Sequence, residues 1–514
     1  MTIRGSRLIA FAAAAQMILS TMPAFAQATP QEGVINIATI GEPPTLDPAT
    51  TTSDVVSIIT QHVFETLYTF TKRWDVAPLL AEAMPRLSDD GMVYTIPIRD
   101  GVKFHNGKVM SSDDVVASLK RWSEVSARGK LAAAVIEQIT AKDASTVEIK
   151  LKQPFAPLLP LLAMNNGAAA IIPQDIAQAG SPIKDFVGTG PYKLLEHRPD
   201  QYVRMVRFDD YVSPPGKPDG YAGERKAIVR ELRFAPVPNA TTRVSGMLSG
   251  QFQFADSLPS ETISQFEGNT MVKPLTAGPA WPFVIINNTK SKLTGNPLIR
   301  QAMLAALNTD DLLAAAFGSP NFFDVSGSIY SDGTIYFDPT TPGYNKPDTK
   351  KAAALLKEAG YKGETLRLIT SQQFDFMYKM ALVAKQQLED VGFKVELLVM
   401  DWASVVRQRE DPTAWDAFTS YNTFVPEPSL LTFINPSYAG WWDTPEKRAA
   451  LAAFNKEMDP NKRVELWKGL QALLYKQAST LIVGQFRNLS AISAKLDGYE
   501  PMPWSAFWNV SIRP

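Results

Sequence analysis

The stretch Asp90–Trp122, DGMVYTIPIRDGVKFHNGKVMSSDDVVASLKRW, predicts a β-hairpin that leads into a capped helix. Tyr94, Ile96 and Ile98 alternate with less apolar neighbours, which is the period-two pattern of a strand with one buried face. Asp100-Gly101 supplies the turn, since Gly tolerates a positive φ. Val102 and Phe104 continue the alternation. The stretch therefore predicts a small β/α unit.

The helix that follows has a start signal and one apolar face. Ser111 stands three residues before Asp114, which resembles a capping box with Asp in place of the usual Glu. Val115, Leu119 and Trp122 then recur at helical spacing. The segment offers no catalytic chemistry, and Gly107-Lys108 is followed by Val109, which excludes a phosphate-binding loop.

This stretch resembles the block found early in bacterial extracellular solute-binding proteins of the peptide/nickel-binding family, the periplasmic receptors of ABC importers. Further blocks stand in family order along the chain: Ala77–Glu82 before this stretch, and Gly188–Leu194 and Asn296–Asn308 after it. A dinucleotide loop is the alternative for Gly188–Leu194, but Lys193 occupies the position of the third Gly and no helix is predicted after it. We therefore expect a hinge-side turn there.

The resemblance implies an α/β, two-lobed periplasmic-binding-protein fold of the large type II kind, with an additional inserted α/β lobe. A length of 514 residues is consistent with two or three domains. The implied division places domain I in residues 27–75, 188–278 and 481–514, the inserted lobe (domain II) in 76–187, and domain III in 279–480. Within domain III, Leu366–Thr370, Phe376–Val391 and Phe393–Val399 predict a strand, a helix and a strand, which form a parallel βαβ unit.

The amino-terminal segment has the pattern of a secretory leader. Arg4 and Arg7 precede the apolar run Leu8–Ala15, and Ala24-Phe25-Ala26 is a cleavage site of the A-x-A type. The alternative, a transmembrane anchor, requires a longer unbroken apolar run. The chain has no Cys, hence neither a lipid-bearing Cys nor a disulfide. We expect a periplasmic protein cleaved after Ala26.

Composition and motifs argue against several other functions. Lys and Arg number 51 against 52 Asp and Glu, so no basic excess points to nucleic acid. A secreted hydrolase is the alternative of a different class, but G-x-S-x-G and H-E-x-x-H are absent. The three His are far apart in the sequence, and His62 lies in an apolar run predicted to continue one helix from Val55 to Tyr68. We expect no enzymatic activity, no catalytic residue, no metal site and no cofactor.

Candidate ligand-binding residues come from predicted strand ends and from the strand that crosses between lobes. Glu42 and Thr45 lie on the loop 42–47, for which a Pro-stiffened surface turn is the alternative. Trp281 opens the crossing strand and suits either ligand contact or core, and Trp402 is a candidate for stacking. The loop 420–428 contributes Tyr421, Asn422, Phe424 and Glu427.

The resemblance adds one expectation about this loop. In peptide-binding relatives it carries an Asp that pairs with the ligand's α-ammonium, shortly before an Asp-Pro step. Here Phe424 stands at the position of that Asp, and Glu427-Pro428 replaces Asp-Pro. The usual ammonium anchor is then missing, unless Glu42 or Glu427 supplies the charge.

The resemblance also implies the partners: a small peptide or peptide-like ligand and an inner-membrane ABC permease, with the receptor itself a monomer. A non-peptide ligand, such as an opine, a sugar conjugate or a metal chelate, is the alternative that the missing Asp favours.

Overall fold

The computed structural model describes residues 31–289, 292–332 and 334–513. The leader predicted for residues 1–26 lies outside the described residues. One large mixed sheet runs through the molecule in the order β15-β14-β16-β12-β18-β11-β1-β10-β9-β8. Its strands are β1 (Gln31–Thr39), β8 (Tyr192–Arg198), β9 (Tyr202–Arg207), β10 (Val229–Pro236), β11 (Phe254–Leu258), β12 (Val272–Ile286), β14 (Thr365–Thr370), β15 (Lys394–Val399), β16 (Ala417–Thr423) and β18 (Gln485–Ser493), with β13 (Phe323–Asp324) and β17 (Thr480–Ile482) paired beside it.

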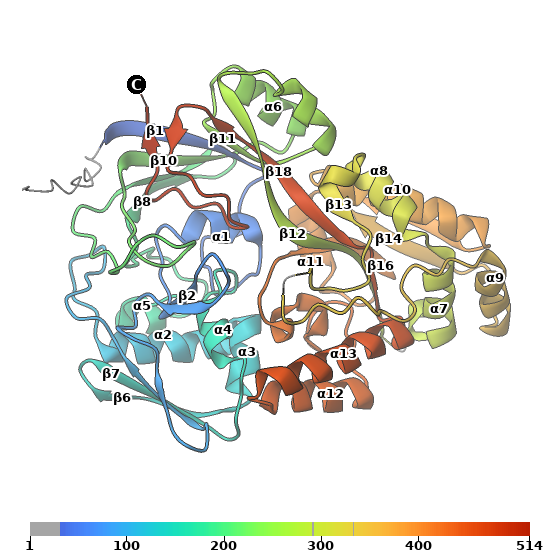
Figure 1. Cartoon of the computed structure of the whole chain (residues 1–514), viewed down its shortest axis with the longest axis horizontal. Helices are drawn as coiled ribbons and strands as arrows, with labels where there is room; N and C mark the ends of the chain where they lie inside the picture. Colours follow the sequence, from blue (N-terminus) through green and yellow to red (C-terminus); the bar gives the residue numbers. More distant parts are fainter. Residues whose placement is uncertain (1–30, 290–291, 333, 514) are drawn as a thin grey trace, which may run out of the picture.

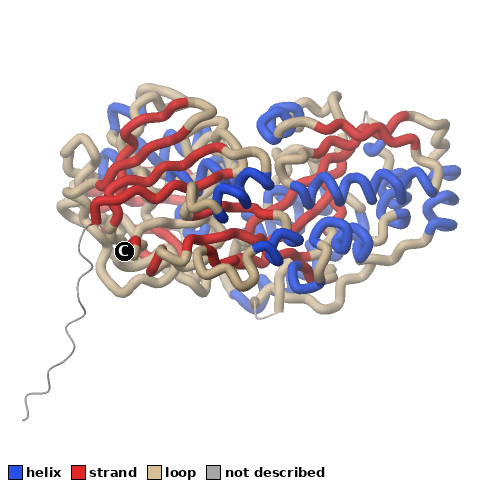
Figure 2. The backbone as a smooth tube through the Cα atoms, turned by 90° about the horizontal axis from the view of Figure 1, so that it is seen from above, coloured by secondary structure: helices blue, strands red, loops and turns tan. Residues whose placement is uncertain are grey.

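The long strands β12 and β18 connect the two ends of this sheet (Figures 1 and 2). The first part of β12, Val272–Ala277, pairs with β18, and its second part, Ala280–Ile286, pairs with β16. We name the part built on β1 and β8–β11 lobe I, and the part built on β14–β16 lobe III. The two lobes therefore share a sheet, and β12 and β18 are the covalent crossings between them.

The helices of these two lobes cover the sheet. Lobe I carries α1 (Asp54–Thr60) and α6 (Ala240–Leu248), and lobe III carries α7 (Pro297–Ala306), α8 (Thr309–Phe317), α9 (Thr349–Glu358), α10 (Asp375–Asp390), α11 (Trp402–Gln408), α12 (Pro445–Lys456) and α13 (Pro460–Gln477). The predicted βαβ unit is confirmed: β14 and β15 are parallel neighbours and α10 connects them. None of the described helices is long and apolar enough to span a bilayer.

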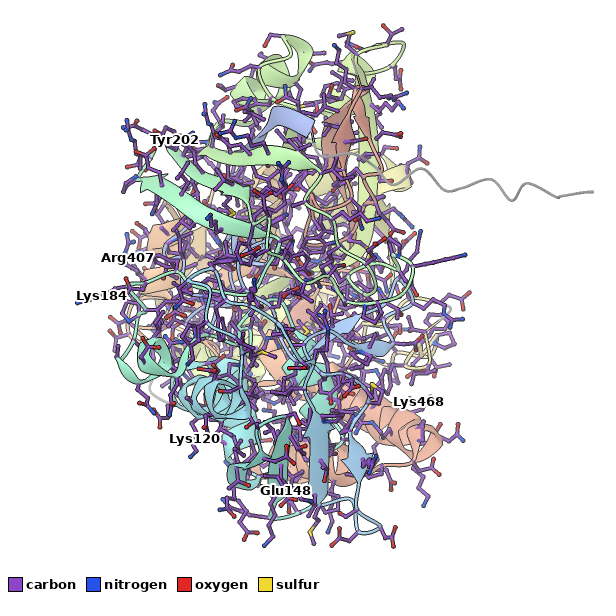
Figure 3. All side chains as sticks on the ribbon, turned by 90° about the vertical axis from the view of Figure 1, so that its left-hand side faces the viewer. Lys120, Glu148, Lys184, Tyr202, Arg407 and Lys468 are labelled. Carbon is purple, nitrogen blue, oxygen red and sulfur yellow. The ribbon has the colours of Figure 1, made fainter. Side chains whose placement is uncertain are left out.

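The quoted stretch Asp90–Trp122 belongs to a separate, smaller unit, which we name lobe II. Its sheet has the order β4 (Arg86–Leu87), β5 (Val93–Pro97), β7 (Thr146–Leu151), β6 (Ile136–Asp143). The helices α2 (Ser112–Val125) and α3 (Ala127–Ala133) pack on this sheet, α4 (Leu158–Ala163) packs against α3, and α5 (Gln174–Gln178) packs against α2. The capping box is confirmed, since Ser111 and Asp114 exchange both hydrogen bonds at the start of α2. Figure 3 shows charged side chains of this region, such as Lys120 and Glu148, projecting outward.

The segment 188–192 joins lobe II to lobe I. The amides of Gly190 and Tyr192 donate to the carbonyls of Val63 and His62 at 2.9 and 3.0 Å. A Cβ atom on Gly190 would lie 2.4 Å from the carbonyl oxygen of His62, so the close approach requires Gly. The predicted helix from Val55 to Tyr68 is wrong in length for this reason: α1 ends at Thr60, and the carbonyls that would continue it are engaged by segment 188–192.

Candidate functional site

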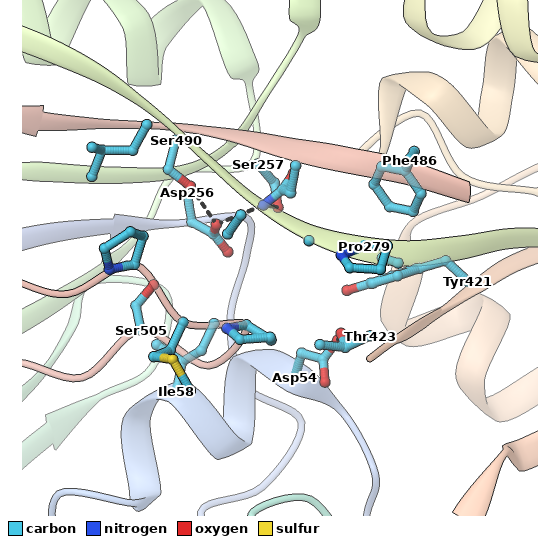
Figure 4. A pocket seen from close by; sticks show the side chains of 18 of the residues that line it. Asp54, Ile58, Asp256, Ser257, Pro279, Tyr421, Thr423, Phe486, Ser490 and Ser505 are labelled. Atoms are coloured by element: carbon cyan, nitrogen blue, oxygen red, sulfur yellow. Dashed lines mark hydrogen bonds between the residues drawn. The ribbon is translucent and has the colours of Figure 1, made fainter. Parts of the chain in front are cut away.

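A pocket lies where lobe I meets lobe III, beside the crossing strands β12 and β18 (Figure 4). Its space is about 650 Å³ including the open mouth. Lobe I contributes the start of α1, the end of β11 and the segment 499–505, and lobe III contributes Phe374, Phe376 and the end of β16. Ligand pockets of proteins are commonly walled largely by apolar side chains with a few polar groups.

Asp54 is the residue at which the two lobes meet. It is the first residue of α1, where the unpaired amides of a helix N-terminus favour a negative charge. Its carboxylate accepts a hydrogen bond of 2.6 Å from the Thr423 hydroxyl of lobe III and one of 2.7 Å from the Trp504 indole of lobe I. The carboxylate therefore lines the pocket and also connects its two walls.

A second carboxylate, that of Asp256, lies on the opposite side of the same pocket (Figure 4). It is carried by β11, a strand parallel to β1. The Asn488 amide and the Ser490 hydroxyl of β18 donate to it at 3.0 and 3.1 Å. Burial raises the pKa of Asp256 above its usual value, so the charged form is less favourable here than in water.

The apolar wall of the pocket is aromatic. Phe376 packs on Phe486 with ring centroids 4.8 Å apart, and Phe374 packs on Tyr421 at 5.4 Å. Burial, and in addition the nearby carboxylate of Asp54, raise the pKa of Tyr421 well above its usual range, so its hydroxyl is a neutral hydrogen-bonding group. Such a wall suits the apolar body of a ligand.

An adjoining pocket shares four residues with the first: Asp54, Phe374, Tyr421 and Thr423. It is also lined by Trp402 and Asn422, and its cationic residue is Arg409. The Arg409 guanidinium donates to the Tyr438 hydroxyl at 3.0 Å and lies over the Tyr438 ring. The two pockets are thus neighbouring parts of one crevice: Asp54 borders both, Asp256 borders the first and Arg409 borders the adjoining one.

Three of the eight residues predicted from the sequence line this crevice. Tyr421 borders both pockets, and Trp402 and Asn422 border the adjoining one. The side-chain oxygen of Asn422 accepts a hydrogen bond of 2.8 Å from the Thr432 hydroxyl, so the orientation of its side-chain amide is set within lobe III. The ring of Trp402 packs edge-on against Phe374 at 5.1 Å.

The loop 42–47 is placed away from the pockets. Glu42 accepts a hydrogen bond of 2.7 Å from the His197 ring and one from the backbone amide of Asp200. The Thr45 hydroxyl accepts from the Asp47 amide within the turn. This arrangement corresponds to the Pro-stiffened turn that was the alternative, and neither side chain borders the crevice described here.

The other three predicted residues are interior. Trp281 is fully buried and packs against Tyr330 and Phe424, and Phe424 in turn packs on Trp74 with centroids 4.8 Å apart. Glu427 is buried and pairs with Arg463 at 2.5 Å. Neither Phe424 nor Glu427 borders either pocket.

Sequence reasoning missed Asp54 and Asp256. A signal for Asp256 existed, because it directly follows the short strand segment 251–255, and the carboxyl ends of parallel strands gather ligand-binding groups. Asp54 carries only the ordinary pattern of an acidic residue in the first turn of a helix. Among the described residues, no group of three or more acidic or histidine side chains is arranged to hold a metal ion.

Two α/β lobes that share crossing strands, with a crevice between them lined by both, define a two-lobed solute-binding receptor. The comparison with known families agrees. The profile of the bacterial extracellular solute-binding proteins, family 5 (middle), matches residues 75–443, and the chain belongs to this family.

Individual relatives are similar over nearly their whole length. The chain is 28% identical to the glutathione-binding protein GsiB of Pectobacterium atrosepticum, over 99% of this chain and 98% of that one. It is 25% identical to a "probable peptide ABC transporter periplasmic-binding protein" of Sinorhizobium fredii, over 90% and 91%. The structure of AgaA from A. tumefaciens R10, in complex with agropinic acid, superposes with a TM-score of 0.83 at 22% identity, over 94% and 99%, and supports the two-lobed fold.

Proposed function

We propose that the chain is the periplasmic receptor of an ABC importer, which captures a small peptide or peptide-like solute in the crevice between lobes I and III and delivers it to an inner-membrane permease. The observation that carries this proposal is the pocket itself, whose walls come from both lobes and meet at the hydrogen bond between Asp54 and Thr423. Closure of two lobes on a ligand is a shift of population, driven by contacts that exist only in the closed form.

Further contacts between the lobes support a closed arrangement around the crevice. Lys379 of lobe III pairs with Glu261 of lobe I at 2.7 Å. Arg128 of lobe II donates to the Leu430 carbonyl of lobe III at 2.8 Å. Separation of lobe III from the other two would break both, so a solute that fills the crevice would stabilise the closed form.

The proposal has several parts beyond the family. The leader is cleaved after Ala26, and the mature protein acts in the periplasm as a monomer without catalysing a reaction. The domains follow the limits expected from the sequence, with domain I in residues 27–75, 188–278 and 481–514, domain II in 76–187 and domain III in 279–480. The position of the four-stranded sheet of lobe II, within residues 86–151, supports this division. An opine is the second candidate ligand, favoured by the fold similarity to AgaA.

Binding without turnover tests the function. A solute that binds only the folded protein stabilises it by about 2.7 kcal/mol at roughly 100 times its Kd. The mature protein is first freed of carried-over solute by unfolding and refolding. We then expect small peptides to raise its melting temperature and to be recovered chemically unchanged. Mass spectrometry before and after incubation supplies the second measurement. A peptide recovered as hydrolysis products would contradict the receptor function.

A further inference from the structure

We propose that the solute carries two positively charged nitrogens, one for Asp54 and one for Asp256. This inference rests on the proposed function, because it takes the crevice between lobes I and III as the solute site. In a peptide the two nitrogens are the amino terminus and a basic side chain.

The first support is the identity of the carboxylates' partners, all of which are neutral. Asp54 accepts from Thr423 and Trp504, and Asp256 accepts from Asn488 and Ser490. Among the described residues that line this pocket there is no Lys, Arg or His. The pocket walls therefore contribute two carboxyl groups and no basic side chain.

The cations near the two carboxylates have their hydrogen bonds elsewhere. Arg128 interacts with the charge of Asp54 but donates to the carbonyls of Asn166 and Leu430 at 2.8 Å each. Arg243 lies behind Asp256 and donates to the carbonyls of Val237, Pro238 and Ser257 at 2.7 to 3.0 Å. Arg487 borders a different pocket and pairs with Asp324 at 2.6 Å. Arg409 borders the adjoining pocket and donates to Tyr438. None of these four arginines donates a hydrogen bond to Asp54 or Asp256, so a solute can supply the directly paired charge.

The electrostatics of the pocket also favours a positively charged solute. Burial raises the pKa of Asp256, and the negative charge of Asp54 raises it further, so the two carboxylates repel each other across the pocket. Hydrogen bonds from Ser490 and the charge of Arg243 oppose this rise without cancelling it. A cation placed beside each carboxylate removes the repulsion and replaces the lost hydration.

The shape of the remaining wall fits the rest of such a solute. The same pocket is lined by the aromatic rings of Tyr421, Phe486 and Tyr499 and by the side chain of Met502. Rings of this kind pack well on the methylene stem of a basic side chain and attract a cation over their faces. An uncharged alkyl chain gains the packing and leaves one carboxylate uncompensated.

Calorimetry with two matched dipeptides tests the proposal. Lysyl-leucine and norleucyl-leucine have similar side-chain length and differ by one ammonium group. We expect wild-type protein to bind lysyl-leucine about 10-fold more tightly, which corresponds to about 1.4 kcal/mol. Asp256→Asn should reduce this preference to about 3-fold or less. Asp209→Asn is the matched control, because Asp209 is 83% exposed and belongs to lobe I outside the pocket, and it should retain the full preference.

Each other outcome is decisive. Equal binding of the two dipeptides by the wild type, or tighter binding of norleucyl-leucine, overturns the proposal, and this comparison needs no variant to fold. A neutral or anionic solute found by native mass spectrometry in the purified protein also overturns it and leaves the receptor function intact. Failure of all peptides to bind, together with no carried-over solute, would instead contradict the proposed function itself.

Discussion

Glu427→Gln is expected to lower the free energy of unfolding by about 3 kcal/mol and to leave solute affinity unchanged. Glu427 and Arg463 are both buried and lie 2.5 Å apart, and the Ser429 hydroxyl donates to the same carboxylate oxygen at 3.1 Å. The substitution keeps the size of the side chain but leaves the guanidinium without a counter-charge. Removal of one partner from a buried ion pair is costly, because the other charge remains desolvated.

Two measurements on the variant separate a structural role of Glu427 from a role in solute binding. Urea unfolding gives its stability, and calorimetry gives its affinity for the solute. Glu465→Gln is the matched control: it lies on the same helix as Arg463, is 71% exposed and pairs with Lys468 at the surface. Exposed pairs contribute at most about 1 kcal/mol, so the control should unfold almost as the wild type does. If Glu427→Gln kept its stability and lost much of its affinity for the solute, Glu427 would be a solute-binding residue.

Local signals in the sequence predicted several elements of the fold correctly. The hairpin predicted with its turn at Asp100-Gly101 is wrong, because β5 pairs with β4 and β7 and residues 102–104 form no strand beside it. The capping box of Ser111 and Asp114 starts α2, and Val115, Leu119 and Trp122 form its buried face as expected. These features depend on residues three or four positions apart, whose interactions the backbone geometry dictates. The helix at 55–68 was predicted too long because its end depends on segment 188–192, more than 120 residues away in the chain.

The candidate site was much less predictable, since it is assembled from distant segments. Asp54 meets Thr423 and Trp504, and Asp256 meets Asn488 and Ser490, each pair more than 200 residues apart in the sequence. Position in one loop also did not determine exposure to the crevice. Tyr421 borders both pockets, whereas Phe424, just beyond the end of β16, is held among Trp74 and Trp281.

A fall in the free energy of unfolding of about 4 kcal/mol is expected between pH 7 and pH 5, from two histidines. Burial lowers the pKa of His62 to about 3 and that of His105 to about 4, against 6.5 for an ordinary His. Both rings are neutral in the fold, where one nitrogen donates to a backbone carbonyl, of Ile59 and of Gly190 respectively, and the other accepts from a backbone amide.

The sign follows from proton binding in the two states. The unfolded chain protonates these histidines below pH 6.5 while the folded protein does not, so stability is full above pH 6.5 and is lost as the pH falls toward the folded pKa values. Each histidine contributes about 2 kcal/mol of the expected change at pH 5. Carboxyl groups with a raised pKa, such as those of Asp256 and Glu427, act in the opposite direction, so a variant is needed to isolate the histidines.

His105→Gln supplies that variant, because Gln can still donate to the Gly190 carbonyl but does not titrate. Its stability should fall about half as steeply as that of the wild type between pH 7 and pH 5, whereas His197→Gln, a partly exposed His beside Glu42, should retain the steep fall. The same slope in wild type and His105→Gln would place the proton uptake elsewhere.

Since both rings contact the polypeptide around segment 188–192 or α1, the junction of lobes I and II is where acid should act first. Faster hydrogen exchange at the amides of Gly190 and Tyr192 at pH 5, after correction for intrinsic rates, is the local measurement that distinguishes this opening from uniform destabilisation.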